Sequence, residues 1–230
     1  MRAIHDNLQA VRERIARAAA GAGRDPRTLT LLAVSKTHPA SRVEEALAAG
    51  QRAFGENYVQ EAVEKMDILA GRPIEWHLIG PLQSNKTRLA AARFDWVHTV
   101  ESGKIARRLS EQRPAGMAPL NVLIQVNVSG EASKSGVAPG EVSRLAGVLS
   151  SFPGIRLRGL MAIPEPTADV ALQRSRFRQV REILARLPGA LDTLSMGMSD
   201  DMESAIAEGS TMVRIGTAIF GARQKIRPAA

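Results

Sequence analysis

The chain has 230 residues, 44% of them hydrophobic and 3% aromatic, and its 31 basic and 23 acidic residues give a net charge of +8. This is enough apolar material for one large α/β domain, and no apolar run is long enough to span a bilayer. The absence of cysteine excludes disulfides, thiol nucleophiles and cysteine–metal sites and is compatible with a cytoplasmic location, while the scarcity of aromatic residues argues against specific nucleic-acid binding.

The N-terminal stretch predicts a helix. Ile4, Leu8, Val11 and Ile15 recur at the spacing of one helical face. The stretch lacks the continuous apolar segment of a signal peptide, and its acidic residues argue against an organellar transit peptide. We therefore expect a structural helix at the front of the domain.

Eight apolar, strand-like runs then alternate with helical stretches. The predicted strands are Leu29–Val34, Arg52–Gly55, Ile74–Leu78, Trp96–Val100, Leu120–Val126, Ile155–Leu160, Leu191–Met196 and Met212–Ile215. The predicted helices are Ser41–Ala49, Tyr58–Leu69, Asn85–Ala92, Gly103–Gln112, Pro139–Ser151, Asp169–Leu187 and Met202–Glu208, with a short one after Thr217. This alternation predicts a (β/α)8 TIM barrel as a single domain over residues 1–230. A doubly wound open sheet is the alternative, weakened because no G-x-G-x-x-G follows the first strand.

The predicted helix Asp169–Leu187 has two different faces. One face is apolar and should pack on the sheet, whereas Arg174, Arg178 and Arg181 share another. The outer helix faces of a barrel point to water, so we expect this basic face to be solvated. The alternative is that it binds an anionic partner.

Small and polar residues cluster at the carboxyl ends of the predicted strands, where TIM barrels place their active sites. The segments concerned are KTH, GENY, HLIGPLQSNK, HTVES, NVSGEASKSG, GLMAIP, SMGMSDD and RIGT. The last two are the most informative, because barrels often bind phosphate with the loops after strands 7 and 8. There Gly197 and Ser199, and then Gly216 and Thr217, precede helices, so backbone N–H groups and hydroxyls can meet an anion.

A helix cap explains part of this pattern. Asp200 fits an N-cap with Glu203 three residues later, and this carboxylate would repel a phosphate if it faced one. The cap does not explain the glycines and hydroxyls, so we expect a phosphate site here.

Closing the barrel sets the eighth strand beside the first, so a ligand with its phosphate at strands 7 and 8 would present its next group to Lys36. Pyridoxal 5′-phosphate (PLP), with an aldehyde and a phosphate arm on adjacent ring positions, matches this geometry, although Lys36 could simply neutralise a phosphate. Arg214 could meet the pyridine nitrogen and leave it unprotonated, which makes the ring a weak electron sink. A structural ion pair is the alternative for Arg214.

The motifs as a set resemble the pyridoxal-phosphate homeostasis protein family (YggS/PROSC type), which is similar to the N-terminal barrel of alanine racemase. The motifs are LLAVSKTHP, FGENYVQE, WHLIGPLQSNK, VNVSGEASKSG, GLMAIP, LSMGMSDDMESAI and VRIGTAIFG, and they span Leu29 to Gly221 in order. The resemblance implies that Lys36 carries PLP as an internal aldimine. It also implies the remaining cofactor-binding residues, which are Asn57 near the ring, Arg214 at the ring nitrogen, Ser199, Gly216 and Thr217 at the phosphate, and Met198.

The resemblance further implies a role in PLP homeostasis, as a buffer or as a carrier to apo PLP-dependent enzymes, without evident catalysis. The alternative is a racemase-like enzyme, which needs an acid or base on each face of the substrate α-carbon. Tyr58, the only tyrosine, is a conceivable second group, but a loop tyrosine more often packs or caps.

Other features carry less weight. His77 and His98 fall near neighbouring strand ends without a metal-ligand motif, so we expect no metal site. Lys134 lies in a Gly/Ser-rich loop that is either solvated or part of a lid over the site. We expect a cytoplasmic monomer without membrane contact.

Overall fold

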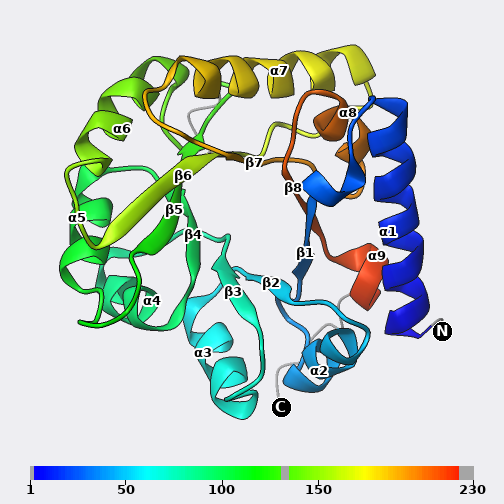
Figure 1. Ribbon diagram of the computed structural model, residues 1–230, viewed down its shortest axis with the longest axis horizontal. Helices are drawn as coiled ribbons and strands as arrows, with labels where there is room; N and C mark the ends of the chain where they lie inside the picture. Colours follow the sequence, from blue (N-terminus) through cyan, green and yellow to red (C-terminus); the bar gives the residue numbers. More distant parts are fainter. Residues whose placement is uncertain (1–2, 131–134, 223–230) are drawn as a thin grey trace, which may run out of the picture.

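The protein, described by a computed structural model over residues 3–130 and 135–222, is a closed barrel of parallel strands ringed by helices (Figure 1). The strands are β1 (Thr30–Val34), β2 (Ala53–Glu56), β3 (Glu75–Leu78), β4 (Trp96–Val100), β5 (Leu120–Val126), β6 (Ile155–Ala162), β7 (Thr193–Ser195) and β8 (Met212–Ile215). They follow one another round the barrel in chain order, and β8 pairs with β1 through Leu32 beside Arg214 and Ala33 beside Ile215. The predicted (β/α)8 barrel is confirmed.

The helices lie outside the strands, as the connections of parallel strands require. They are α1 (Ile4–Gly21), α2 (Ala40–Ala48), α3 (Val59–Ile68), α4 (Thr87–Arg93), α5 (Gly103–Glu111), α6 (Val142–Leu149), α7 (Val170–Arg186), α8 (Met202–Ala207) and α9 (Thr217–Phe220), with 3-10 turns at Pro26–Thr28, Ser84–Lys86 and Pro139–Glu141. No helix in the described ranges combines the length and apolar character needed to cross a bilayer.

Among the described residues, the buried apolar side chains form three clusters, one of which consists of Leu32, Val34, Ala53, Ile79 and Met212. Side chains directed outward pack with the helices into the main apolar core, whereas Trp96, Leu123 and Met161 form a smaller cluster of their own. Every residue of β4 is buried, and β5 is buried along nearly its whole length. Burial on both faces explains why both strands are rich in apolar residues and are predicted from the sequence.

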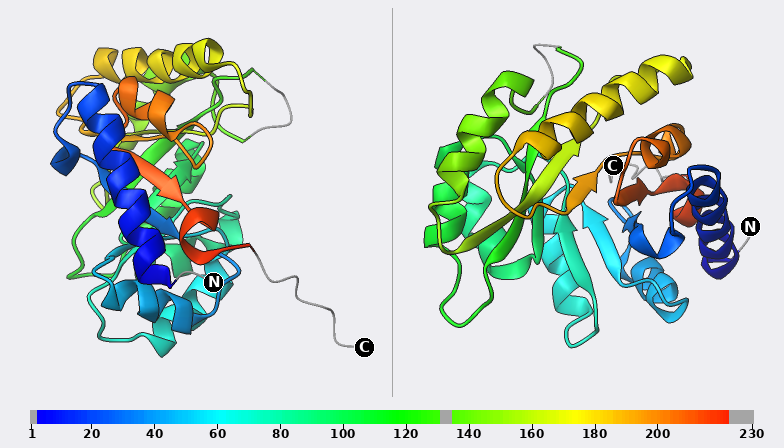
Figure 2. Two further views of the ribbon diagram at one scale, coloured as in Figure 1. Left: turned by 90° about the vertical axis from the view of Figure 1, so that its right-hand side faces the viewer. Right: turned by 45° about the horizontal axis from the view of Figure 1, so that its top comes forward.

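The N-terminal helix α1 is part of the barrel wall. Its buried face, which includes Ile4, Leu8, Val11 and Ile15, packs against α8, α9 and α2, so α1 covers the seam where β8 meets β1 (Figures 1 and 2). The predicted N-terminal helix is confirmed, and its place over this seam sets it next to the loops predicted to bind phosphate.

The basic face of α7 is exposed, as expected, but its arginines also share a partner within the protein. Arg174, Arg178 and Arg181 contact the carboxylate of Glu208, at 2.8, 2.9 and 3.5 Å, and the side chain of Glu208 is only 2% exposed. Burial raises the pKa of Glu208, but the hydrogen bonds from Arg178 and Arg174 outweigh it and hold this pKa below its ordinary value. The three arginines therefore anchor α7 to the end of α8.

The predicted cap at α8 is also wrong in its details. The helix begins at Met202 with Asp201 as the cap residue, and Oδ1 of Asp201 accepts a hydrogen bond from the backbone N–H of Met198 at 2.6 Å. Glu203 pairs with Arg14 of α1 instead of closing a capping box. Asp201 therefore fixes the loop before α8 through Met198, and Glu203 ties the start of α8 to α1 through Arg14.

Candidate cofactor site

Lys36 lies in a tight turn directly after β1. The backbone N–H of Ser35 still donates to the carbonyl of Gly55 on β2, at 3.0 Å, and Thr37 then takes a left-handed conformation with φ of 65°. That conformation is unusual for a β-branched residue, so the surrounding structure must stabilise it. Lys36 itself is half-buried at the carboxyl end of the barrel.

A buried lysine fixes the near side of this turn. The Nζ of Lys65, on α3, donates to the carbonyl of Ser35 at 2.8 Å and to Oε1 of Glu56 at 2.7 Å. The Ser35 hydroxyl donates to the same Glu56 oxygen at 2.6 Å. Lys65 and Glu56 are both buried, so this ion pair is shielded from water and its geometry is tightly specified.

The far side of the turn is fixed by the same cluster. Oε1 of Glu61 accepts from Nζ of Lys65 at 2.7 Å and from the backbone N–H of Thr37 at 2.6 Å. The residues on either side of Lys36 are thus tied to one lysine–carboxylate network. This network sets the direction in which the chain delivers Lys36.

Burial destabilises the charged form of Glu56. Burial raises the pKa of its carboxyl, and the attraction of Lys65 offsets this only in part. Its second oxygen, Oε2, is buried without a hydrogen-bond partner among the described residues. The carboxylate thus depends on Lys65 for most of its stabilisation.

Arg214 lies in the barrel interior beside the first strand. Its guanidinium donates from Nη1 to the carbonyl and the hydroxyl of Ser195, at 2.6 and 2.8 Å, and from Nη2 to the carbonyl of Ala162, at 3.0 Å. Burial lowers the pKa of Arg214 to about 10, which leaves it charged at neutral pH. Among the described residues its hydrogen-bond partners are all neutral, so hydrogen bonds to neutral groups hold it there, in place of the structural ion pair considered as the alternative.

Gly216 and Thr217 follow at the same seam. A Cβ at Gly216 would lie 3.2 Å from the carbonyl oxygen of Val34, so the chain passes close against the end of β1 just before Lys36. Thr217 is exposed and begins α9, and Phe220 of that helix stacks with His38, their ring centroids 5.2 Å apart. The turn of Lys36 and the loop after β8 are therefore neighbours.

The loop after β7 reaches the same place. The carbonyl of Gly197 accepts from the backbone N–H of Arg214 at 3.0 Å. Two residues on, the carbonyl of Ser199 accepts from Nη2 of Arg14 at 2.8 Å, while the same arginine pairs with Glu203. Helix α1 thereby holds the loop that carries Ser199.

Asn57 extends the group to the second strand. It follows β2 directly, and its backbone packs against Gly80, where an added Cβ would lie 2.2 Å from the carbonyl oxygen of Asn57. The neighbouring Tyr58 is 58% exposed at the start of α3. Asn57 therefore lies against the segment that follows β3. It comes from the end of β2, the strand next to the one that carries Lys36.

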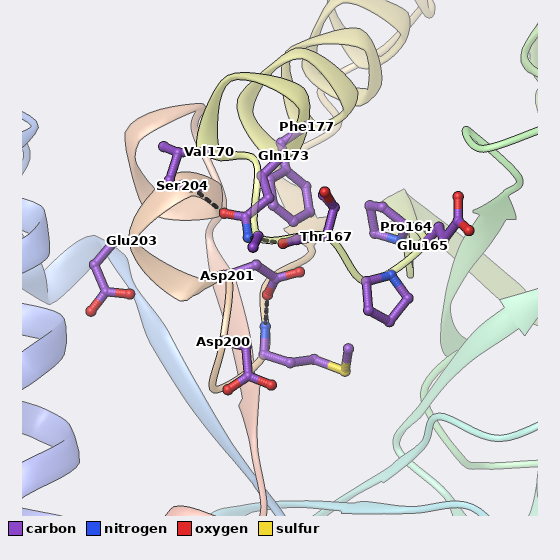
Figure 3. A pocket seen from close by; sticks show the side chains of 13 residues that line it. Pro164, Glu165, Thr167, Val170, Gln173, Phe177, Asp200, Asp201, Glu203 and Ser204 are labelled. Carbon is purple, nitrogen blue, oxygen red and sulfur yellow. Dashed lines mark hydrogen bonds between the residues drawn. The ribbon is translucent and has the colours of Figure 1, made fainter.

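A pocket of about 690 Å³ opens beside this group, between the connection that follows β6 and the loop before α8 (Figure 3). It is lined by Met198 but not by Lys36, and Asp200, Asp201 and Glu203 give it an acidic side. Carboxylates repel a phosphate, so this pocket is unsuited to the phosphate group.

The predicted site residues come from four neighbouring strands. Their places are the ends of β1 (Lys36), β2 (Asn57), β7 (Met198 and Ser199) and β8 (Arg214, Gly216 and Thr217). Lys134 lies outside the described residues. The sequence analysis missed Glu56, Glu61 and Lys65, although a carboxylate closing a buried strand and a Glu–Lys pair four residues apart on a helix were visible signals.

His77 is the next-to-last residue of β3, near the strand end as expected, whereas His98 is the middle residue of the neighbouring β4. Both are fully buried in the barrel interior. No group of three or more potential metal ligands gathers within the described parts of the chain. The two histidines contact each other, and His98 also contacts Ser195, whose hydroxyl accepts a hydrogen bond from Arg214.

The donor set fits a phosphorylated aldehyde such as PLP. It combines an amine held in a rigid turn, a guanidinium with a fixed plane, and a glycine at the β1–β8 seam that is followed directly by the hydroxyl of Thr217. Amine, guanidinium and hydroxyl groups are the donors that an aldehyde, a ring nitrogen and a phosphate require.

Comparisons with known proteins place the chain among relatives that include a PLP-bound structure. Residues 6–224 match the family model described as alanine racemase, N-terminal domain. The chain is 62% identical to the pyridoxal phosphate homeostasis protein of Pseudomonas aeruginosa, covering 100% of both chains, and 56% identical to that of Escherichia coli, covering 97% and 98%. PipY of Synechococcus elongatus, solved with PLP bound, is 37% identical with a TM-score of 0.82, over 95% of this chain and 100% of PipY.

Proposed function

Because the chain belongs to the alanine racemase N-terminal domain family, and within it to the pyridoxal phosphate homeostasis proteins, we propose that it binds PLP through Lys36 and buffers or delivers it. The amine of Lys36 would condense with the cofactor aldehyde to a Schiff base, with loss of water. The observation that carries this proposal is the fixed turn of Lys36 beside the β1–β8 seam. The PLP bound to the relative PipY supports it independently.

The other site residues would hold the cofactor without bonding to it. Ser199, Gly216 and Thr217 offer hydroxyl and backbone donors to the phosphate, with Met198 beside them on the same loop. Asn57 would lie near the ring. Arg14 would act on the phosphate only indirectly, by fixing the backbone of the loop that contains Ser199.

Arg214 supports a carrier more than a catalyst. When bound, PLP supplies an electron sink whose strength depends on protonation of its ring nitrogen. Arg214 stays charged at neutral pH, so it would donate to that nitrogen and leave it unprotonated. A site arranged in this way binds PLP while weakening its use in carbanion chemistry.

A racemase-like enzyme is the second candidate, and it needs another acid or base opposite Lys36. Tyr58 is the one tyrosine in the sequence, but its 58% exposure does not suit a group that must work against a desolvated cofactor. We therefore favour the carrier. A single-domain protein, a monomeric state, a cytoplasmic location and apo-enzymes as recipients remain predictions.

Transfer of PLP to an acceptor tests the function. The holo-protein is mixed with an apo PLP-dependent enzyme, and the return of that enzyme's activity is compared with the rate at which the holo-protein releases PLP into buffer. Transfer faster than free release supports delivery, whereas transfer no faster supports a buffer alone. Single-enantiomer amino acids are incubated in parallel, and turnover that depends on Lys36 but not on the exposed Lys104 would favour the enzyme.

A further inference from the structure

Five polar side chains form a continuous line through the interior of the barrel. Nη1 of Arg214 lies 2.8 Å from Oγ of Ser195, which lies 3.1 Å from Nδ1 of His98. Nε2 of His98 lies 3.0 Å from Nδ1 of His77, and Nε2 of His77 lies 2.9 Å from Oε1 of Glu75. The last contact is close but not aligned as a straight hydrogen bond.

This line crosses the barrel. His98 is on β4 and Ser195 on β7, two strands that are not neighbours in the sheet, so their hydrogen bond spans the interior. The line begins at Arg214, next to the site of Lys36, and ends at Glu75, the first residue of β3, which is 49% exposed at the opposite end of the barrel. Every member between these ends is buried.

The protons in this line have one consistent order. A guanidinium can only donate, so Ser195 accepts from Arg214 and is free to donate its own proton to Nδ1 of His98. His98 then carries its proton on Nε2 and donates to Nδ1 of His77. A carboxylate can only accept, so His77 carries its proton on Nε2, facing Glu75. Each bond thus fixes the tautomer of the next ring.

This order requires both histidines to be neutral, and their surroundings favour that state. Burial lowers the pKa of His77 despite the attraction of Glu75 and Asp95. Burial, together with the nearby His77 and the charge of Arg214, lowers the pKa of His98 well below its ordinary value. Trp96 stacks on His77, with ring centroids 5.4 Å apart, and fixes the plane of that ring.

We propose that Ser195, His98 and His77 form a one-way hydrogen-bond chain, anchored at Glu75, that positions the guanidinium of Arg214 toward its ligand. The cofactor part of this inference rests on the proposed function, in which Arg214 meets the ring nitrogen of PLP. Ser195, His98 and His77 are positioning residues, because they act through Arg214 and not on the cofactor.

Among the described residues, the guanidinium of Arg214 is hydrogen-bonded to neutral groups, and the nearby carboxylate of Asp201 acts on it only through space. A carboxylate would engage two N–H groups of the guanidinium and neutralise its charge. A serine whose proton is committed to His98 accepts one hydrogen bond and leaves the charge intact. Together with the carbonyls of Ser195 and Ala162, it occupies three of the five N–H groups, so within the described structure two remain for a ligand.

The order of the protons can be measured without cofactor. Two-bond ¹H–¹⁵N correlation spectra of the ligand-free protein report the tautomer of each imidazole, and the chain has only four histidines. We expect both His77 and His98 to be neutral and protonated on Nε2 at pH 7. A charged ring, or an Nδ1 proton on either residue, would overturn the proposal, whatever the protein does with PLP.

Ser195→Ala then tests the effect on Arg214, with Ser210→Ala as its matched control. Ser210 is an equally buried serine whose hydroxyl bonds only to backbone carbonyls of β7, β8 and the loop between β7 and α8. We expect Ser195→Ala to release PLP about tenfold faster than wild type, because an oriented bond to a charged group is lost. We also expect the His98 tautomer to become mixed in this variant.

Ser210→Ala should leave both the release rate and the His98 tautomer unchanged. Equal release rates in wild type and Ser195→Ala, with an intact His98 tautomer, would refute the positioning role. If the wild-type protein failed to bind PLP at all, the proposed function would be refuted. The tautomer measurement would still show whether the hydrogen bonds from Arg214 to His77 have the proposed order.

Discussion

Lys65→Met tests whether the buried cluster stabilises the turn of Lys36. Methionine has a similar length and no charge, so the variant removes the three hydrogen bonds of Nζ and keeps most of the packing. Glu56 then remains buried with only the Ser35 hydroxyl as donor. Leaving one partner of a buried ion pair uncompensated costs about 3–5 kcal/mol of unfolding free energy.

The pH dependence of this loss has a definite sign. The folded-state pKa of Glu56 is already raised by burial, so its carboxylate destabilises the fold increasingly as pH rises from its unfolded pKa through its folded pKa. Without Lys65 the folded pKa rises further. At pH 5 the variant can protonate Glu56, so its deficit should be smaller there than at pH 8, by roughly 1.4 kcal/mol for each further unit of pKa shift.

Urea unfolding of wild type, Lys65→Met and the exposed control Lys104→Met at pH 8 and pH 5 measures this directly. The double variant Glu56→Gln/Lys65→Met should recover most of the loss, because neither partner is then left charged. A deficit below about 1 kcal/mol at pH 8, the size expected of an exposed pair, would refute the reasoning. So would a deficit that is equal at the two pH values.

Three further predictions concern the rest of the site and its frame. Arg14→Ala should release PLP several-fold faster while lowering stability by less than about 1 kcal/mol, because its ion pair is partly exposed; stopped-flow release is compared with the exposed Arg17→Ala. Glu208→Gln should destabilise the fold at pH 7 by about 1 kcal/mol, because the three arginines left behind are half-exposed and water can solvate them. Since the pKa of Glu208 is lowered, the gap between variant and wild type should close as pH falls through that pKa; acid and urea unfolding measure this. Gly216→Ala places a Cβ 3.2 Å from the carbonyl of Val34, so PLP affinity should fall about tenfold with a small change in melting temperature, and unchanged affinity would contradict a tight seam there.

The sequence predicts the barrel well because parallel strands buried on both faces are rich in apolar residues. The bounds Trp96–Val100, Leu120–Val126 and Met212–Ile215 agree with β4, β5 and β8 residue for residue. The seventh strand, predicted over Leu191–Met196, is shorter, since only Thr193–Ser195 pair with their neighbours as a strand. Apolar content alone does not mark where hydrogen bonding to a neighbour stops.

The site is predictable in its outline, because carboxyl strand ends and strand closure follow from the fold class. That reasoning places Lys36 next to the residues after β8, as the contact of Gly216 with Val34 bears out. The supports of the site are not predictable in the same way. Lys65 and Arg14 act through contacts whose partners are set by helix packing, and local sequence carries no record of those distances.

The partners of the basic face of α7 and of the two histidines are unpredictable for a related reason. A run of arginines on one helix face is usually solvated, and only the position of Glu208 at the end of α8 gives Arg174, Arg178 and Arg181 a shared partner. His98 bonds to a serine almost a hundred residues away, across the barrel. These contacts join residues that are far apart in the sequence and come together only when the whole barrel has closed.

Covalent trapping at Lys36 tests the central claim most directly. The protein is loaded with PLP, reduced with borohydride, digested, and the modified peptide is located by mass spectrometry. The proposed function predicts the pyridoxyl group on Lys36, and its loss in Lys36→Ala but not in Lys104→Ala. A reduced adduct on another lysine of the wild-type protein, or an undiminished yield in Lys36→Ala, would contradict it.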